Sequence, residues 1–118
     1  MKSTITPLPE ILAKKLTAIH LICRRYHVKY LWVFGSVLEE AFSKDSDIDF
    51  LYEFDGAALQ QGKYLPNLDG LIEGMIAIFP TRKIDLVDYQ SLRNPYFIRS
   101  IEATKILLYA QRPEEIPV

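Results

Sequence analysis

Hydrophobic side chains recur along this chain first at helical spacing and then at strand spacing. Over residues 9–26 the apolar positions follow a repeat of four, three, four, three, which predicts a helix with one core-facing stripe. Residues 28–34, VKYLWVF, form an almost unbroken β-branched and aromatic run, typical of a strand covered on both faces. Two further strands are predicted over residues 47–54 and 83–87; polar and apolar side chains alternate at the start of each, over 47–50 and 83–86, which is the period of a half-buried strand.

Two later segments have helical character. Apolar residues over 68–79 recur at helical spacing and stop before Pro80, which predicts a second core helix. Gly70 and Gly74 each lower its intrinsic stability by about 1 kcal/mol relative to alanine, so we expect them to serve close packing. Asn94 followed by proline is a helix start and predicts a last helix over 96–109, with Phe97 among its buried residues.

The order of these elements predicts one α/β (α+β) domain over residues 1–118, with a loose tail at 112–118. We expect a small mixed β-sheet with helices covering one face and with the strands' polar side chains on the other. Half of the composition is apolar, at 49%, and a quarter is charged, at 25%, as in ordinary globular proteins.

Composition excludes several classes of function. No apolar run reaches the length of a membrane span and residues 1–9 carry no apolar signal core, so we expect a cytoplasmic protein. Cys23 is the single cysteine, which rules out an internal disulfide and, with two histidines, a Cys/His zinc site. We expect Cys23 to be a small buried hydrophobic residue. A net charge of −1 gives no bulk attraction to nucleic acid, so direct nucleic-acid binding is not expected without a local basic patch.

Asp47 and Asp49 open the second predicted strand. Because side chains alternate along a strand, both carboxylates lie on one face while Ile48 and Phe50 lie on the other. Their Cα atoms are about 6.5 Å apart, from two strand rises, so both carboxylates can reach one or two cations. Without a cation, two like charges at that spacing raise each other's pKa.

Gly35 and Ser36 end the first predicted strand. Ser36 with Glu39 three residues later makes a capping-box pattern, which predicts Ser36 as the N-cap of a short helix. A glycine beside a helix N-terminus also offers backbone N–H groups and a hydroxyl to phosphate, and both roles are compatible. Glu39 and Glu40 are unfavourable near phosphate unless they point away or a metal offsets them.

Gly35-Ser36, ten intervening residues and Asp47-x-Asp49 on a strand resemble the signature of the DNA polymerase β-like nucleotidyltransferases. The short chain is similar to their minimal nucleotidyltransferase branch, with a motif core over residues 28–109, although related sequences commonly carry a basic residue and a glycine at 39 and 40. The resemblance implies a third carboxylate on a following strand. Asp85 matches this third carboxylate, because it lies on the opposite strand face from its apolar neighbours. Considered without the resemblance, Asp85 would be read as a solvent-facing residue.

Oxygen ligands of this kind select Mg²⁺ or Mn²⁺. By resemblance, Asp47, Asp49 and Asp85 would hold the metal, Gly35 and Ser36 would hold the phosphates of ATP, and AMP would pass to a hydroxyl acceptor. Minimal members resemble antitoxins paired with a HEPN-domain toxin that they modify on tyrosine.

Two alternatives remain open: a weakly catalytic antitoxin that inhibits by binding, and transfer to a small molecule such as an aminoglycoside, for which this chain lacks an enclosing domain. A homo-oligomer is also compatible with the sequence. The basic residues of the last predicted helix region, Arg93, Arg99 and Lys105, either are solvated or meet phosphate.

Overall fold

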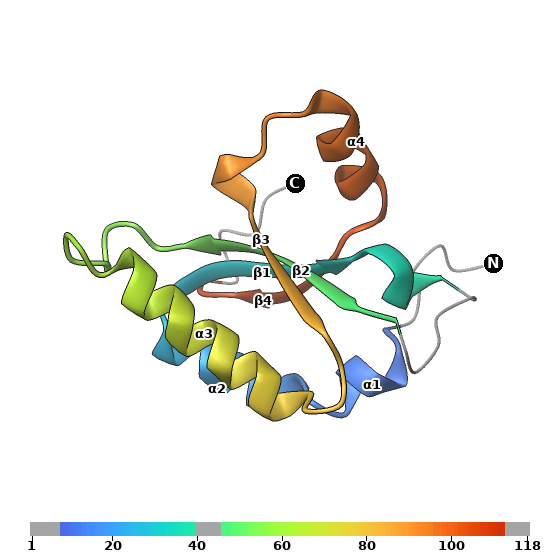
Figure 1. The fold of residues 1–118 in the computed structure, drawn as a ribbon, viewed down its shortest axis with the longest axis horizontal. Helices are drawn as coiled ribbons and strands as arrows, with labels where there is room; N and C mark the ends of the chain where they lie inside the picture. The colour runs from blue at the N-terminus through green and yellow to red at the C-terminus, as the bar shows by residue number, and fades with distance from the viewer. Residues whose placement is uncertain (1–7, 40–45, 113–118) are drawn as a thin grey trace.

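The computed structural model describes residues 8–39 and 46–112 (Figure 1). The elements in chain order are α1 (Glu10–Ala13), α2 (Leu16–Arg25), β1 (Val28–Phe34), the 3-10 turn η1 (Gly35–Leu38), β2 (Ile48–Phe54), α3 (Tyr64–Ile78), β3 (Ile84–Asp88), the 3-10 turn η2 (Tyr89–Ser91), α4 (Pro95–Thr104) and β4 (Ile106–Ala110). No helix among the described residues is long and apolar enough to cross a membrane.

The strands form one four-stranded sheet in the order β3-β2-β1-β4. β1 pairs antiparallel with β2 and with β4, whereas β2 pairs parallel with β3. Parallel neighbours need a crossover connection, and α3 supplies it between β2 and β3. The sheet is therefore mixed, as the sequence predicted.

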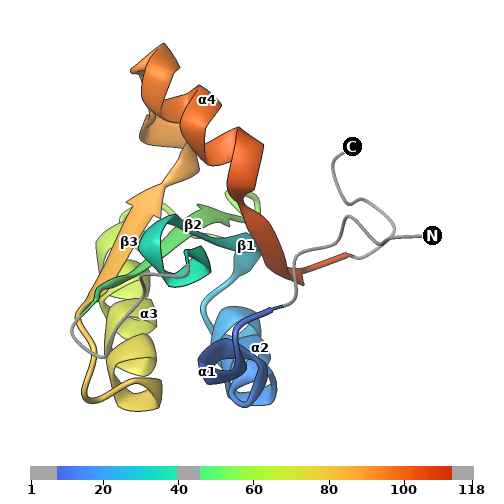
Figure 2. The ribbon, with the colours of Figure 1, turned by 90° about the vertical axis from the view of Figure 1, so that its right-hand side faces the viewer.

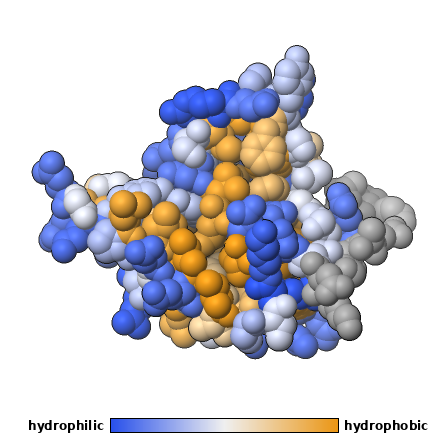
Figure 3. Space-filling view, viewed as in Figure 1, coloured by the Kyte–Doolittle hydropathy of each residue, from blue (hydrophilic) through white to orange (hydrophobic). Residues whose placement is uncertain are grey.

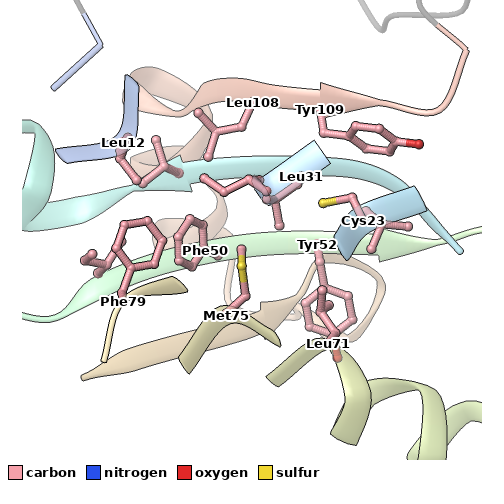
Figure 4. Close-up of a cluster of buried hydrophobic side chains, with 14 of the residues drawn as sticks. Leu12, Cys23, Leu31, Phe50, Tyr52, Leu71, Met75, Phe79, Leu108 and Tyr109 are labelled. Carbon is pink, nitrogen blue, oxygen red and sulfur yellow. The ribbon is translucent and has the colours of Figure 1, made fainter. Parts of the chain in front are cut away.

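Helices α1, α2 and α3 cover one face of the sheet, and α4 lies over part of the other face (Figures 1 and 2). The alternation of β1 divides its side chains between two apolar clusters. Leu31, labelled in Figure 4, and Val33 join the large core under α2 and α3. Trp32 and Phe34 instead pack with Ile101 of α4. The predicted cover on one face is confirmed, and α4 adds a partial layer opposite.

Packing within the large core explains two sequence features. A Cβ at Gly74 would lie 2.8 Å from Cδ1 of Ile22 and one at Gly70 would collide with the ring of Tyr26, so both glycines let α3 approach α2 closely, as predicted. Cys23 is fully buried, and burial raises the pKa of its thiol to about 12, which confirms a packing residue.

The helix predicted over residues 9–26 is divided in two. The backbone N–H of Lys15 donates to the carbonyl of Leu12 at 3.0 Å, three residues back, which tightens the end of α1 before α2 begins. α3 in turn begins at Tyr64, earlier than predicted. Pro66 is tolerated there because the first turn of a helix leaves its N–H groups without intrahelical partners.

The helix predicted over residues 96–109 is wrong beyond Thr104. Lys105 is extended, with φ −60 and ψ 146, and the next five residues form β4. β4 pairs with the edge of β1 and places Leu108 and Tyr109 in the large core. Pairing and burial thus override a helical spacing that is apparent when the segment is considered alone.

Candidate active site

Two carboxylates and one aromatic residue form a row across the sheet. In the parallel register Asp49 of β2 lies opposite Asp85 of β3, and in the antiparallel register Asp49 lies opposite Phe34 at the end of β1. Neighbouring strands are about 4.8 Å apart. Asp49 alternates with the core residues Ile48 and Phe50, so it lies on the face away from α1, α2 and α3.

The carboxylate of Asp49 is in an unfavourable environment for a negative charge. Its pKa is raised above the ordinary value of 3.8, first by burial and then by the charges of Asp85 and Asp47. The charges of both other aspartates therefore act on Asp49, although Asp85 itself is exposed. A cation among them would lower the pKa of Asp49 and relieve the repulsion.

In the part of the chain that the structure describes, no group of three or more His, Cys, Asp or Glu side chains is arranged to hold a metal ion. Mg²⁺ is commonly bound by one or two carboxylates together with waters and substrate phosphates. The neighbouring oxygen donors of Asp49 and Asp85 fit such an ion, with the remaining ligands supplied by a bound substrate.

Gly35 lies directly against the carboxylate of Asp49. Its φ is +82, in the left-handed region, and a Cβ at this position would collide with Oδ2 of Asp49. Glycine is required here on both counts, since any other residue would be strained and would displace the carboxylate. The end of β1 and the carboxylate of Asp49 on β2 are thereby packed together.

Ser36 is not a helix N-cap, so the capping-box prediction is wrong. Gly35–Leu38 is a single 3-10 turn that contains Ser36, and Glu39 is already extended with its N–H donating to the carbonyl of Ser36 at 3.0 Å. The Ser36 hydroxyl donates to the carbonyl of Asp47 at 3.5 Å, which is long for an O–H donor. Glu40 lies outside the described residues.

A pocket of about 770 Å³ opens beside Asp49, between η1 and α4. Gly35, Glu39 and Asp49 line one side, and Phe97 and Thr104 of α4 line the other. This volume lies within the range of small-molecule sites. Phe97 is 41% exposed, so the prediction that it is a buried residue is wrong.

Sequence reasoning missed this second wall, because nothing in the local sequence shows that α4 lies over the end of β1. The available signal was the spacing of Phe97, Ser100 and Thr104, which places them on one helix face.

The sequence also did not reveal a link made by Arg82. Its Nη1 donates to the carbonyl of Ser46 at 3.3 Å, which joins the segment before β3 to the segment before β2.

Among the predicted basic candidates, Lys105 lines the pocket, whereas Arg93 and Arg99 are not among its lining residues. Lys105 Nζ makes an ion pair with Glu102 Oε1 at 2.5 Å and lies 5.3 Å from the centre of the Trp32 ring. Arg93 Nη1 donates to the carbonyls of Gln90 and Leu92, each at 2.9 Å.

Residues 17–114 match the family described as Polymerase beta, Nucleotidyltransferase. One curated relative, a candidate protein adenylyltransferase of Methanocaldococcus jannaschii, is 30% identical over 106 residues, covering 89% of this chain and 98% of the relative. A second candidate protein adenylyltransferase of the same organism is 32% identical over 101 residues, covering 84% and 92%.

Solved structures share the fold. A candidate minimal nucleotidyltransferase is 24% identical, with a TM-score of 0.65, and the match covers 89% of this chain and 98% of that one. A toxin–antitoxin structure with AMP-PNP is 17% identical, with a TM-score of 0.61 over 84% of this chain and 76% of that one. Because the family match spans residues 17–114, this chain belongs to the polymerase β nucleotidyltransferase family.

Proposed function

We propose that this chain transfers AMP from ATP to a hydroxyl group of a protein partner with the aid of a divalent metal ion. The observation that carries the proposal is the register that sets Asp49 beside Asp85, with Gly35 packed against the Asp49 carboxylate. Two relatives of at least 30% identity are described as candidate protein adenylyltransferases, which supports a protein acceptor.

Asp47, Asp49 and Asp85 would hold Mg²⁺ or Mn²⁺. When bound, the metal would supply charge stabilisation at the α-phosphate and a lower pKa for the acceptor hydroxyl. The chain's own contribution is to bring carboxylates from two strands to one place on a rigid sheet. Asp85 is exposed on the edge strand β3, so it is the carboxylate that an incoming acceptor reaches and the one that accepts its proton.

In the transfer, the acceptor oxygen forms a bond to the α-phosphorus of ATP. The bond between that phosphorus and the oxygen bridging to the β-phosphate breaks, and pyrophosphate leaves with the electron pair. The proton of the acceptor hydroxyl passes to Asp85 and then to solvent. Products are the AMP ester of the acceptor and pyrophosphate, so no oxidant or further reactant is needed.

Gly35 and Ser36 would hold the β- and γ-phosphates. The missing side chain of Gly35 leaves its backbone open to close approach, and Gly35 lines the pocket beside Asp49. The Ser36 hydroxyl makes only a long hydrogen bond to Asp47, so it can turn to a phosphate oxygen at small cost. Glu39, which lines the same pocket, opposes phosphate binding.

We further propose that the acceptor is a tyrosine of a HEPN-domain toxin and that the protein acts as its antitoxin in the cytoplasm. The solved toxin–antitoxin structure with AMP-PNP has the same fold. A partner needs a surface to bind, and hydrophobic side chains gather along the exposed side of α3 (Figure 3), where Leu65 is 68% and Ile76 is 48% exposed.

The test is transfer from α-labelled ATP, with Mg²⁺, to a helical partner protein encoded beside this chain. We expect label on a partner tyrosine, found as an added AMP by mass spectrometry, and loss of labelling with Asp49→Asn. Asp55→Asn is the matched control, because it lies just past the other end of β2 and asparagine preserves its hydrogen bond from the N–H of Ala57. A partner that stays unmodified but is still bound and silenced by Asp49→Asn protein would support inhibition by binding instead.

A further inference from the structure

We propose that Phe97 of α4 is the nucleobase-binding residue of this site, with the base of the donor nucleotide stacked on its ring. The inference rests on the proposed function, because it assumes that a nucleotide occupies the pocket beside Asp49. Beyond the proposed function, the inference identifies the part of the nucleotide that the α4 wall of the pocket recognises and the bases that this wall accepts.

The position of the pocket separates the two substrates. Across the sheet the order is β3, β2, β1, β4, so Asp85 lies on one side of Asp49 while Phe34 and Ile106 lie on the other. The pocket includes Asp49, Phe34 and Ile106 and does not include Asp85. A nucleotide with its α-phosphate near Asp49 therefore extends toward α4 and β4, and the side of Asp85 remains free for the acceptor.

One face of α4 forms the wall that the nucleoside would meet. Phe97, Ser100, Ile101 and Thr104 follow helical spacing and all line the pocket. Ile101 is buried in the smaller apolar cluster and holds the helix against the sheet. Phe97, one turn earlier, remains 41% exposed, so this face presents an uncovered aromatic ring above a pocket that contains a carboxylate.

The ring of Phe97 is held in place before any ligand binds. It meets the ring of Phe34 edge-on, with centroids 6.2 Å apart and planes at 75°. Its backbone N–H donates to Oδ1 of Asn94 at 3.3 Å, and Tyr96 donates to the same oxygen at 2.9 Å, which fixes the start of α4. A contact at this steep angle covers at most one face of the Phe97 ring, and because the side chain is 41% exposed, a face remains available for stacking. A ring that is already restrained has less conformational entropy to lose on binding.

Stacking on a phenyl ring recognises the π-face that every nucleobase has. The larger purine bases stack more strongly, so the site should prefer purine to pyrimidine nucleotides and should discriminate weakly between adenine and guanine. The ligand class is thus a purine nucleoside triphosphate.

The test measures Mn²⁺-dependent binding of two ligands by calorimetry: the α,β-methylene analogue of ATP, and inorganic tripolyphosphate, which has no base. For Phe97→Leu, which retains apolar packing without a flat ring, we expect ATP-analogue binding to fall by about tenfold or more and tripolyphosphate binding to remain unchanged. Phe97→Trp should restore binding of the analogue. The wild-type protein should bind the UTP analogue more weakly than the ATP or GTP analogue.

Tyr96→Ala is the matched control. Tyr96 precedes Phe97 on α4 but is 76% exposed, is not among the pocket residues and lies against Arg99. We expect it to bind both ligands as wild type does. Equal weakening of both ligands by Phe97→Leu, or no weakening of either, would overturn the role of Phe97 while leaving the proposed transfer intact. Failure of the wild-type protein to bind either ligand would overturn the proposed function and this inference together.

Discussion

Asp49 of β2 and Asp85 of β3 occupy the same register position on neighbouring parallel strands. Their side chains emerge on the same face of the sheet, and their backbones are about one interstrand spacing, 4.8 Å, apart. Like charges placed so close oppose folding of the metal-free protein. A cation bound between the two carboxylates would offset this repulsion and stabilise the folded protein.

Asp49→Asn should leave the metal-free fold as stable as wild type, or more stable, near neutral pH. The folded protein raises the pKa of Asp49, so the wild-type free energy of unfolding falls as pH rises from 3.8 through the raised pKa. Asparagine removes this contribution and flattens that part of the pH profile. Urea unfolding measured from pH 3 to pH 7 checks it. Loss of the folded state in Asp49→Asn at pH 7 would instead mean that the carboxylate is structural.

Metal and nucleotide together should stabilise the protein more than either alone, because each supplies ligands or charge that the other lacks. At a free ligand concentration 100 times the Kd, about 2.7 kcal/mol is added to the free energy of unfolding. The Tm measured with Mn²⁺, with the ATP analogue and with both checks this expectation. Asp49→Asn should lose the joint effect and Asp55→Asn should keep it. A wild-type Tm shift with both ligands that is no larger than the sum of the two separate shifts would contradict the shared site.

Gly35→Ala should destabilise the fold and abolish nucleotide binding. The left-handed φ of +82 costs a non-glycine residue about 1–2 kcal/mol, and the new Cβ would displace the Asp49 carboxylate. Gly56→Ala provides the comparison, since a Cβ there meets nothing within 4 Å. Urea unfolding and calorimetry on both variants separate the effects. Nucleotide binding by Gly35→Ala at the wild-type level would mean that the close approach to Asp49 does not matter for the site.

Glu39→Gln should bind ATP more tightly than wild type, because it removes a negative charge from the lining of the phosphate pocket. The side chain is exposed, so we expect a gain of about fivefold or less at low ionic strength and a smaller gain at high salt. Glu10→Gln, at an exposed position of α1 that is not in the pocket lining, should change nothing. Kd values for the ATP analogue at two salt concentrations are the measurement. A larger Kd for Glu39→Gln than for wild type would indicate that Glu39 contacts metal or nucleotide directly.

Local patterns were enough to predict the central frame of the site. Strand alternation puts Asp49 on the opposite side of β2 from Ile48 and Phe50 whatever surrounds it, and the same reasoning separates Asp85 from Ile84. The spacing of apolar residues over 68–79 likewise identified α3, because residues three or four apart lie on the same face of a helix.

Only the tertiary structure decided which elements meet. Residues 106–109 were predicted to extend a helix, but they pair with the edge of β1 and form β4. Hydrogen bonding between strands that are distant in the sequence cannot be read from the spacing of apolar residues in one segment. Ser36 fits a capping box in sequence, yet the chain turns out of η1 at Glu39, so no α-helix follows in the described residues for it to cap. The sequence by itself determined which side chains share a face of each strand, because alternation is a property of the backbone. The opposing wall formed by Phe97 depends on where α4 packs, which is decided by long-range burial of Ile101 against the sheet.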